Sequence, residues 1–596
     1  MAGEVKIRRR AIRYQINMGS KTPNFDKELN KVLIELKPHK RTCSQCGRKF
    51  EILNEDIEFY KILKVSPPKL CPSCRMQRRM VFVKRLPKFY RRDCEAKGHK
   101  ESLISTYPKE SPIHIYDFKY YFSDNWDATD YGMNFDSHKS FFKQFYSLVL
   151  KVPHADIPDK DPNAVNSTYI LSGYYPKNCY FSVGPYQSEG IYYSYLTTYS
   201  KDCFDGTRID HCELGYWLID CKHCYKSFFL QKCRNCIECF FLYDCANCQN
   251  CFCCTNLRNK KYYFFNRPLG KEEYQRKIKQ IYLGNRENLI RIKEEFQKII
   301  QQEGIHRAIM NRKVENCIGD DLNNCKDCYI AFGGINSENI RYGQIFIDLK
   351  DSIDVTNTVK GSNCYETALA EDVYDVKFSN IIRGGLSVEY SRECYNCEYI
   401  FGCVGLRYKK YRIFNKAYTP QEYWKLVDKI KTKMLKDGEY GEFFPISASL
   451  YPYNDTFAYI NFPLGRKEVE KIGGWWYEQS KFPDVKDLSI LKASDVPQDI
   501  KEVDDSILNK AIICEKTEKP FRIIKKELDF YRRYQLPLPT VHPVQRILDR
   551  FQNVNPYKLW KTICQKCHRE IYTSYPPEKQ KELKIYCEKC YLEDVG

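Results

Sequence analysis

Apolar and polar positions repeat every twelve residues through the middle of the chain. In the segments YWLIDCKHCYKS, SFFLQKCRNCIE and FFLYDCANCQNC, one leucine position and two cysteine positions recur at this interval. The leucines are Leu218, Leu230 and Leu242, and the cysteines are Cys221, Cys233 and Cys245, and Cys224, Cys236 and Cys248. A fixed interval of this kind favours short parallel strands stacked as a β-solenoid. We place this first ladder at 161–268, and the repeat leaves open whether one coil contains twelve or twenty-four residues.

The same interval returns farther along the chain. Its positions are Cys328, Ile340, Ser352 and Cys364, followed by a step of nine to Val373, and the first ladder contains a similar step of nine from Cys203 to Cys212. Both ladders end in a Leu-Arg-x-Lys cap, at Leu257 and at Leu406, which lie 149 residues apart. The sequence therefore predicts a mixed, β-rich fold with a duplicated Cys and Tyr ladder, whose second copy spans 313–416.

Helical periodicity appears beside the ladders. Within 271–302, apolar residues recur at steps of three and four, which predicts one amphipathic helix packed on a ladder. The assigned segments are a helical connector at 121–160, a helical linker at 269–312, and a helix with a wrapping linker at 417–510.

Paired cysteines at both ends of the chain have the spacing of zinc ribbons. Near the N-terminus two C-x-x-C pairs are separated by 24 residues, and near the C-terminus two are separated by 19. The predicted ligands are Cys43, Cys46, Cys71 and Cys74, and Cys564, Cys567, Cys587 and Cys590. Four thiolates suit a closed tetrahedral site and select Zn²⁺. We predict two structural zinc sites.

The two ends also resemble each other. A shift of 471 positions aligns Cys43 with Cys514 without a gap. The residues opposite the other three ligands are Thr517, His542 and Gln545. One gap further, a second N-terminal copy has retained Cys94 alone. We therefore predict tandem ribbons at 1–120, where the first holds zinc, and at 511–596, where the second holds zinc; a partial site of Cys514 with His542 is the weaker alternative.

Positive charge is concentrated at one end. Of the net charge of +20, residues 1–100 supply 16, because they contain 26 Lys and Arg against 10 Asp and Glu. A basic run with interleaved aromatic residues follows the first zinc site, which favours a surface that binds phosphates and stacks bases. Its predicted residues are Arg75, Arg78, Arg79, Lys84, Arg85, Arg91 and Arg92, joined by an N-terminal arm of Arg8, Arg9 and Arg10. The leading hypothesis is a non-catalytic, nucleic-acid-binding protein, with RNA or a ribonucleoprotein as the preferred partner.

The chain has 30 cysteines and no segment that suggests secretion or membrane insertion, so we expect cytoplasmic, reduced thiols. The stacked pairs in the first ladder allow a second interpretation, because they could hold extra zinc or an iron–sulfur cluster. Its ligands would be Cys221, Cys224, Cys233, Cys236, Cys245 and Cys248. Inert thiols inside the ladder are the simpler interpretation.

Two other classes of function remain open. A structural or assembly scaffold could bind another protein through the faces of the ladders. Catalysis finds less support, because no P-loop, dinucleotide fingerprint or nucleophile elbow is present. A metal-dependent nuclease would have to use a loop of carboxylates, with Asp156, Asp159 and Asp161 close to His154.

Several further motifs are distributed along the chain. They are Leu70-Cys-Pro-x-Cys-Arg-x-Gln-Arg-Arg79, Tyr-Gly-x-x-Phe-Asp at 131–136, the two Leu-Arg-x-Lys caps, Glu442-Phe-Phe-Pro445 and Tyr586-Cys-Glu-x-Cys-Tyr591. Together they resemble those of a family of large, cysteine-rich zinc-ribbon proteins of candidate-phyla-radiation bacteria. The resemblance spans nearly the whole chain and implies this architecture, without an activity.

Overall fold

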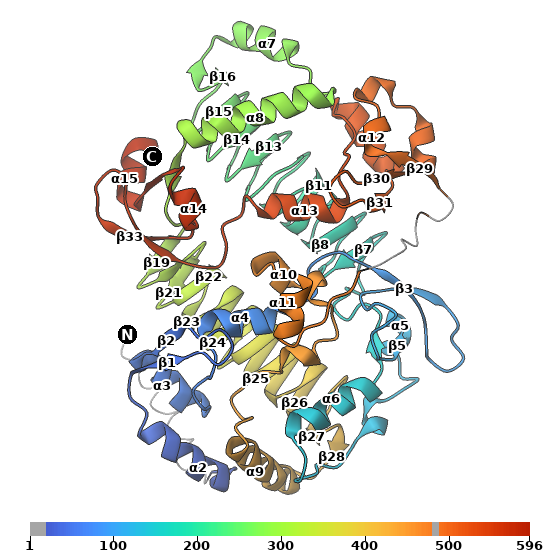
Figure 1. The fold of residues 1–596 in the computed structure, drawn as a ribbon, viewed down its shortest axis with the longest axis vertical. Coiled ribbons are helices and arrows are strands. Elements are labelled where there is room, and N and C mark those ends of the chain that lie inside the picture. The colour runs from blue at the N-terminus through green and yellow to red at the C-terminus, as the bar shows by residue number, and fades with distance from the viewer. Residues whose placement is uncertain (1–19, 479–484, 486–487) are drawn as a thin grey trace.

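The computed structural model describes residues 20–478, 485 and 488–596. The fold is mixed α/β, with two ladders of parallel strands at its centre and helical modules from both chain ends along their sides (Figure 1). In the described part of the chain, no helix combines the length and apolarity needed to cross a bilayer. The predicted arm of Arg8, Arg9 and Arg10 lies outside the described residues.

The N-terminal end folds into two small modules. The first N-terminal module (23–80) contains α2 (Pro23–Ile34), β1 (His39–Thr42), β2 (Lys49–Ile52), α3 (Asn54–Leu63) and α4 (Pro72–Met80). The second N-terminal module (90–121) contains β3 (Tyr90–Asp93), β4 (Ser102–Ser105), β5 (Ile115–Tyr116) and α5 (Phe118–Tyr121). A connector with η1 (Ala128–Tyr131), α6 (Phe141–Lys151) and β6 (His154–Ala155) leads to the first ladder.

The first ladder is a stack of short parallel strands. Its strands are β7 (Thr168–Leu171), β8 (Tyr180–Tyr186), β9 (Glu189–Tyr192), β10 (Tyr195–Thr198), β11 (Lys201–Phe204), β12 (Thr207–Asp210), β13 (Phe228–Gln231), β14 (Phe240–Tyr243), β15 (Phe252–Thr255) and β16 (Tyr263–Phe264), closed by β17 (Arg267–Pro268). Paired residues are twelve apart, as in Leu230 with Leu242. Single bridges continue this offset between β12 and β13, as from Tyr216 to Phe228.

The pairing interval in this ladder is twelve residues, because each strand pairs with the chain twelve residues later. The pairing also shows that the step of nine from Cys203 to Cys212 does not change the interval of the ladder. Lys201 bridges Glu213 and Phe204 bridges Tyr216, so the pairing stays at twelve across this region. Cys203 and Cys212 therefore belong to two different columns of side chains.

The backbone of the first ladder turns at short, regular intervals. Every third residue has a positive φ, as at Asp202 (49°), Asp205 (52°) and Arg208 (57°). Each left-handed residue turns the chain, which gives four turns in twelve residues, and Asn and Asp tolerate this conformation well. Asn residues one rung apart also bond to each other: the Asn235 amide donates to Asn247 over 2.8 Å.

The second ladder has the same construction with longer strands. It contains β19 (Arg312–Glu315), β20 (Ile318–Asp320), β21 (Asn323–Lys326), β22 (Tyr329–Ile335), β23 (Glu338–Arg341), β24 (Gln344–Ser362), β25 (Tyr365–Glu389), β26 (Arg392–Phe401), β27 (Lys410–Ile413) and β28 (Lys416–Ala417). Its first pairs are eleven apart, as in Arg312 with Asn323, and later pairs are twelve apart. Gly361 pairs with Val373, twelve residues later. The step of nine from Cys364 to Val373 therefore also joins two different columns of side chains.

The helix predicted at 271–302 is two helices, α7 (Lys271–Gln280) and α8 (Arg286–Gln302). The break falls at Gly284 and Asn285, whose side chain accepts from the Asn288 N–H and starts α8. Helix α8 lies across β14 and β15 of the first ladder (Figure 1). Its buried Phe296 packs against Phe241, with ring centroids 5.8 Å apart. Strand β18 (Ile305–Arg307) follows α8, and α9 (Pro420–Lys436) follows the second ladder.

The rest of the chain wraps the ladders and ends in two further modules. The wrapping segment contains η2 (Ile446–Ala448), η3 (Tyr453–Asp455), α10 (Phe457–Asn461), α11 (Arg466–Lys471), β29 (Ser489–Lys492), η5 (Ala493–Asp495), η6 (Ile500–Glu502) and η7 (Asp505–Asn509). The first C-terminal module (510–551) contains β30 (Lys510–Ile513), β31 (Pro520–Phe521), α12 (Lys525–Tyr534) and α13 (Pro543–Phe551). The second C-terminal module (560–595) contains β32 (Trp560–Ile563), β33 (Glu570–Thr573), α14 (Pro577–Gln580), β34 (Lys584–Tyr586) and α15 (Glu588–Val595).

The first N-terminal module packs on the second ladder, and the first C-terminal module packs on the first ladder. Helix α4 packs on β24 and β25 of the second ladder, whereas α13 packs beside β12 of the first (Figure 1). Helices α12 and α13 begin and end 471 residues after α3 and α4. Each end of the chain therefore covers the ladder that is farther from it in sequence.

Candidate metal centres and an aromatic pocket

Four thiols meet in the first N-terminal module. The turn between β1 and β2 carries Cys43 and Cys46, and the start of α4 carries Cys71 and Cys74. The Cys43 N–H donates to the Arg48 carbonyl over 2.9 Å, and Gly47 takes a positive φ of 70° in this turn. The four sulfurs lie within 4.8 Å of one another.

The second C-terminal module repeats this arrangement. The sulfurs of Cys564, Cys567, Cys587 and Cys590 lie within 4.8 Å of one another. A hydrogen bond from Arg569 lowers the pKa of Cys567 to about 6, which favours the thiolate that a metal needs. The predicted pair of four-cysteine groups able to hold a metal is confirmed.

Sulfur spacing tests whether a metal fits these groups. Cys46 Sγ and Cys71 Sγ are 3.8 Å apart, and Cys567 Sγ and Cys587 Sγ are also 3.8 Å apart. A tetrahedral site with metal–sulfur bonds of about 2.3 Å, as for Zn²⁺, requires sulfurs about 3.8 Å apart. Both groups therefore fit a tetrahedral metal with all four positions filled by protein, which suits a structural role.

The first C-terminal module keeps the same backbone without the thiols. The Cys514 N–H donates to the Lys519 carbonyl over 3.0 Å, and Glu518 takes the positive φ (55°) of Gly47. His542 replaces a ligand at the start of α13, where its Nδ1 accepts from the Val544 N–H over 3.2 Å. Among the described residues, the two four-cysteine groups are the sites where at least three ligand atoms come within 4.8 Å. Cys514 and His542 do not belong to such a group.

The second N-terminal module has lost its ligands in a similar way. The Asp117 N–H donates to Cys94 Sγ over 3.3 Å, as the Cys587 N–H does to Cys564 Sγ in the metal-binding counterpart. The Asp117 carboxylate also accepts from the backbone of Lys119 and so caps α5. Capping replaces the metal at this helix start.

The six ladder cysteines proposed as extra ligands are buried inside the first ladder. Their thiols donate to backbone carbonyls, as from Cys233 to Gln231 over 3.3 Å and from Cys245 to Tyr243 over 3.4 Å. None of the six lies in a group of three close ligand atoms. The extra metal site therefore gains no support, and the thiols serve as small packing groups. In the described part of the chain, the cysteines are free thiols.

Most of the predicted basic surface is buried, so that prediction is wrong. Six of its residues have exposed fractions of 8% or less: Arg75, Arg78, Arg79, Lys84, Arg85 and Arg92. Arg75 Nε lies 2.8 Å from Asp354, and Arg79 Nη1 lies 3.0 Å from Glu366. Arg75, Arg78 and Arg79 lie on helix α4, and the face that carries them points into the second ladder. Arg91 is exposed.

The first C-terminal module repeats this contact on the other ladder. Arg546 Nη1 lies 2.9 Å from Asp205 and Arg550 Nη1 lies 2.6 Å from the same carboxylate. Arg550 also donates to Thr207 over 2.9 Å, as Arg79 does to Thr356 over 3.1 Å. A sequence signal existed, because Arg75 and Arg546 align at the offset of 471, and Asp205 and Asp354 lie 149 residues apart.

The residues considered for a nuclease serve the fold. His154 lies 2.9 Å from buried Glu393 and 2.8 Å from the Val149 carbonyl. Asp161 accepts from the Asn163 N–H over 2.9 Å, and burial raises the pKa of Asp156 to about 6. These groups do not form a cluster of three close metal ligands.

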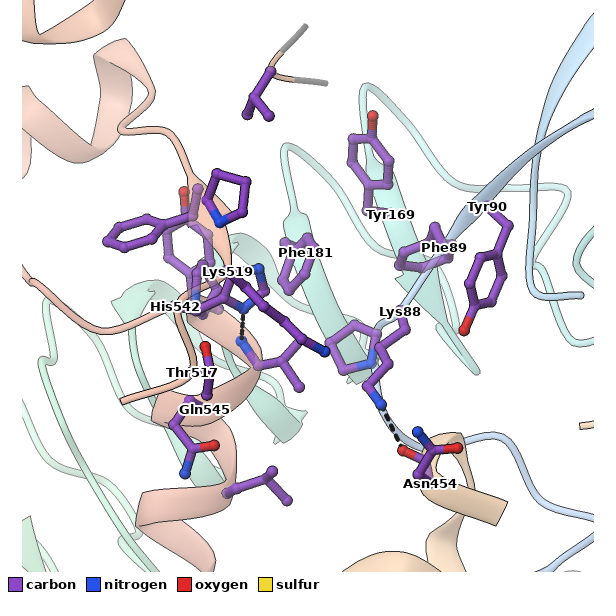
Figure 2. A pocket seen from close by; sticks show the side chains of 18 of the residues that line it. Lys88, Phe89, Tyr90, Tyr169, Phe181, Asn454, Thr517, Lys519, His542 and Gln545 are labelled. Carbon is purple, nitrogen blue, oxygen red and sulfur yellow. Dashed lines mark hydrogen bonds between the residues drawn. The ribbon is translucent and has the colours of Figure 1, made fainter. Parts of the chain in front are cut away.

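A pocket of about 290 Å³ lies where the second N-terminal module, the first ladder, the wrapping segment and the first C-terminal module meet (Figure 2). One wall is aromatic. Phe89 lies 5.3 Å from Tyr169 and 6.3 Å from Phe181, measured between ring centroids. Tyr90 and Tyr477 form a further edge-to-face pair at 5.5 Å. The sequence shows aromatic residues at Phe89 and Tyr90, but nothing in this run indicates ring partners 80 or more residues away.

The pocket is also basic. Lys88, Arg91, Lys519 and Arg522 line it together with one acidic residue, Glu478. Lys88 Nζ donates to the Asn454 carbonyl over 2.7 Å and lies 2.9 Å from Asp455.

The three lost ligand positions form part of the same pocket. Thr517, His542 and Gln545 appear together on its far side from Phe89 and Tyr169 in Figure 2. Burial, with help from Lys519, lowers the pKa of His542 to about 3, so this imidazole is neutral at physiological pH.

No protein-family model, curated protein or solved structure matches this chain. The function must therefore be argued from the sites themselves.

Proposed function

We propose that this protein is a zinc-stabilised, non-catalytic protein that binds single-stranded nucleic acid, preferably RNA, through the aromatic pocket. The observation that carries the proposal is a cavity of about 290 Å³ that combines a cluster of edge-to-face aromatic rings with four cationic side chains. Aromatic faces stack on bases of any sequence, and cations neutralise the phosphates.

The size of the pocket supports a single base. Ligand pockets in proteins span roughly 300–1,000 Å³, so this cavity lies at the small end of that range. Phe181 and Tyr169 are partly exposed, which leaves their rings accessible to a ligand. RNA is preferred because sequence-specific recognition of RNA mostly targets unpaired bases, which can leave their stack and pack on aromatic side chains.

The other parts of the molecule support the pocket without forming it. We assign Zn²⁺ to both four-cysteine groups because soft thiolates select it. The ladders with their rungs of twelve residues are best described as two β-solenoids, which hold the four modules in place. Free thiols throughout the described chain agree with a reducing, cytoplasmic compartment.

The test is RNA binding by full-length protein freed of copurified nucleic acid, measured by fluorescence anisotropy with a labelled single-stranded oligonucleotide. Phe181→Ala removes one stacking ring, and we expect binding to weaken by about 1–3 kcal/mol, as for one lost base contact. Tyr374→Ala is the matched control, because Tyr374 is a half-exposed aromatic residue on the second ladder. Unchanged binding in the Phe181 variant, or none in the parent protein at low salt, would contradict the proposal.

A scaffold that binds another protein is the second candidate, favoured by an exposed row of rings on the first ladder. Tyr174 stacks on Tyr186 at 4.7 Å, and His211 stacks on His223 at 4.8 Å. Tyr174 and Tyr186 are each 39% exposed. A stoichiometric protein partner that is lost with Tyr186→Ser and retained with Phe181→Ala would favour this candidate over the first.

A further inference from the structure

We infer that the metal site lost from the first C-terminal module has become the part of the pocket that reads the edge of a base, so that the pocket takes a nucleoside monophosphate or the matching unit of RNA. This inference rests on the proposed function and adds a recognition element to it. The elements involved are Thr517, His542 and Gln545, which occupy the positions of three metal ligands and face the pocket (Figure 2).

The first step is that this module no longer needs a metal. The turn that would carry the first two ligands keeps its backbone geometry, because the Cys514 N–H donates to the Lys519 carbonyl over 3.0 Å. Two buried arginines, Arg546 and Arg550, fasten α13 to Asp205 of the first ladder. A small metal-bound module can lose its metal once packing and ion pairs hold it. The former ligand positions were thus free to take another role.

The second step is the chemistry that replaced the thiols. Thr517 offers a hydroxyl that can donate and accept, and Gln545 offers an amide that can do both. The Thr517 hydroxyl is shielded from solvent and has no hydrogen-bond partner among the described residues. Gln545 uses one amide hydrogen on Asp549, over 2.9 Å, and retains its carbonyl oxygen for a ligand. A shielded hydroxyl without a partner is unfavourable unless a ligand satisfies it.

The third step is the division of charge within the pocket. The replaced ligand positions carry no charge, because the pKa of His542 is held at about 3. The cationic side chains come from other positions: Lys88 precedes β3, Arg91 lies on β3, and Lys519 and Arg522 follow Thr517 in the first C-terminal module. A neutral polar wall suits the edge of a base, and the cationic residues suit its phosphate. The aromatic wall of Phe89, Tyr169 and Phe181 would stack on the face of the same base.

The test uses the full-length protein and the four nucleoside 5′-monophosphates, titrated by isothermal calorimetry. We expect one base to bind at least tenfold more tightly than the weakest of the four. Thr517→Val and Gln545→Met remove hydrogen-bonding groups at nearly constant size, and each should reduce that preference by roughly 5- to 150-fold while weak, stacking-dependent binding remains.

A rebuilt metal site gives an opposite and independent readout. The triple variant Thr517→Cys, His542→Cys, Gln545→Cys would complete a four-thiol group with Cys514. We expect its metal content to rise from two to three ions per chain and its nucleotide binding to be lost.

The outcomes separate this inference from the proposed function. If Phe181→Ala weakens RNA binding but Thr517→Val and Gln545→Met leave base preference unchanged, the recognition role is wrong and the RNA-binding role stands. If Phe181→Ala leaves RNA binding intact, the proposed function itself fails. A triple variant that gains a third metal and still binds nucleotides would also overturn the recognition role.

Discussion

The first N-terminal module and the first C-terminal module have the same fold but only one has a metal site. Helices α3 and α4 correspond to α12 and α13 at an offset of 471, and the helix ends at Lys64 and Gln535 both adopt a left-handed conformation. Four thiols meet in the N-terminal module, whereas Cys514 alone remains in the C-terminal one. The metal is therefore not required for this fold.

The feature that both modules retain is a pair of arginines, one helical turn apart, that enters a ladder. Arg75 and Arg79 contact Asp354, and Arg546 and Arg550 contact Asp205. Guanidinium groups hold carboxylates with paired hydrogen bonds in fixed geometry, so they set the position of each helix on its ladder. The comparison teaches that docking, more than metal binding, defines this module.

The largest expected effect comes from removing the docking carboxylate on the metal-free side. Asp205→Ala leaves Arg546 and Arg550 buried with fewer partners, and loss of one member of a buried ion pair costs about 3–5 kcal/mol. Urea unfolding followed at the first C-terminal module, by hydrogen exchange of α13, should report this loss.

Asp354→Ala is the matched control for that experiment. Arg79 retains a second carboxylate of the ladder, Glu366 at 3.0 Å, whereas Arg546 retains Glu527, which belongs to its own module, at 3.2 Å. The N-terminal module should therefore lose less stability than the C-terminal one. If Asp205→Ala and Asp354→Ala lower the stability of their modules equally, Glu366 does not compensate for the loss of Asp354, and this expectation is wrong.

The next largest effect concerns metal content, which should depend on cysteines in the first N-terminal module but not on Cys514 in the first C-terminal module. Cys46→Ser should reduce the metal content of the protein from two ions to one, and Cys514→Ser should leave it at two. We expect Cys46→Ser to cost less stability than Asp205→Ala, because the arginine contacts of α4 remain. Elemental analysis of purified variants measures the metal, and hydrogen exchange of α4 measures the stability. Metal loss from the Cys514 variant would contradict the comparison.

The parts of the fold that the sequence predicted depend on local patterns. Leu218, Leu230 and Leu242 showed the twelve-residue rung, and the spacing of Cys43 and Cys46 showed a ligand pair, because in both cases the relevant neighbours are close in sequence. The direction of the basic face of α4 could not be predicted in this way. Arg75 pairs with Asp354, which is 279 residues away, and a run of arginines looks the same on a surface and in an interface.

The candidate pocket could not be predicted from local sequence patterns. Its residues run from Pro87 to Leu548 and come from four parts of the chain. Each part contributes several lining residues, but the pocket forms only where the four parts meet, so no single segment carries a motif for it. The alignment that exposed Thr517, His542 and Gln545 as lost ligands identified the right residues, but their new surroundings required the tertiary structure.

A smaller effect should appear on acidification, at one module only. His542 is neutral in the folded protein, with its pKa lowered from 6.5 to about 3 by burial, so the unfolded chain binds more protons below pH 6.5. Stability is therefore full above pH 6.5 and falls as the pH is lowered toward 3. At pH 5 the expected loss is about 2 kcal/mol. Hydrogen exchange of α13 measures it, and His542→Gln, which can keep the helix cap, should remove this part of the pH dependence.

The smallest effect concerns the position where the two α-helices differ most in environment. Arg78 of α4 pairs with Glu366 at 3.0 Å and is buried, whereas its counterpart Asp549 of α13 pairs with Lys516 at 2.8 Å on the surface. Lys516 is 51% exposed, and an exposed ion pair contributes at most about 1 kcal/mol. Lys516→Ala should therefore change urea stability by less than about 1 kcal/mol, and Arg78→Ala by about 3–5 kcal/mol. Equal effects of the two substitutions would mean that burial at this position does not separate the modules.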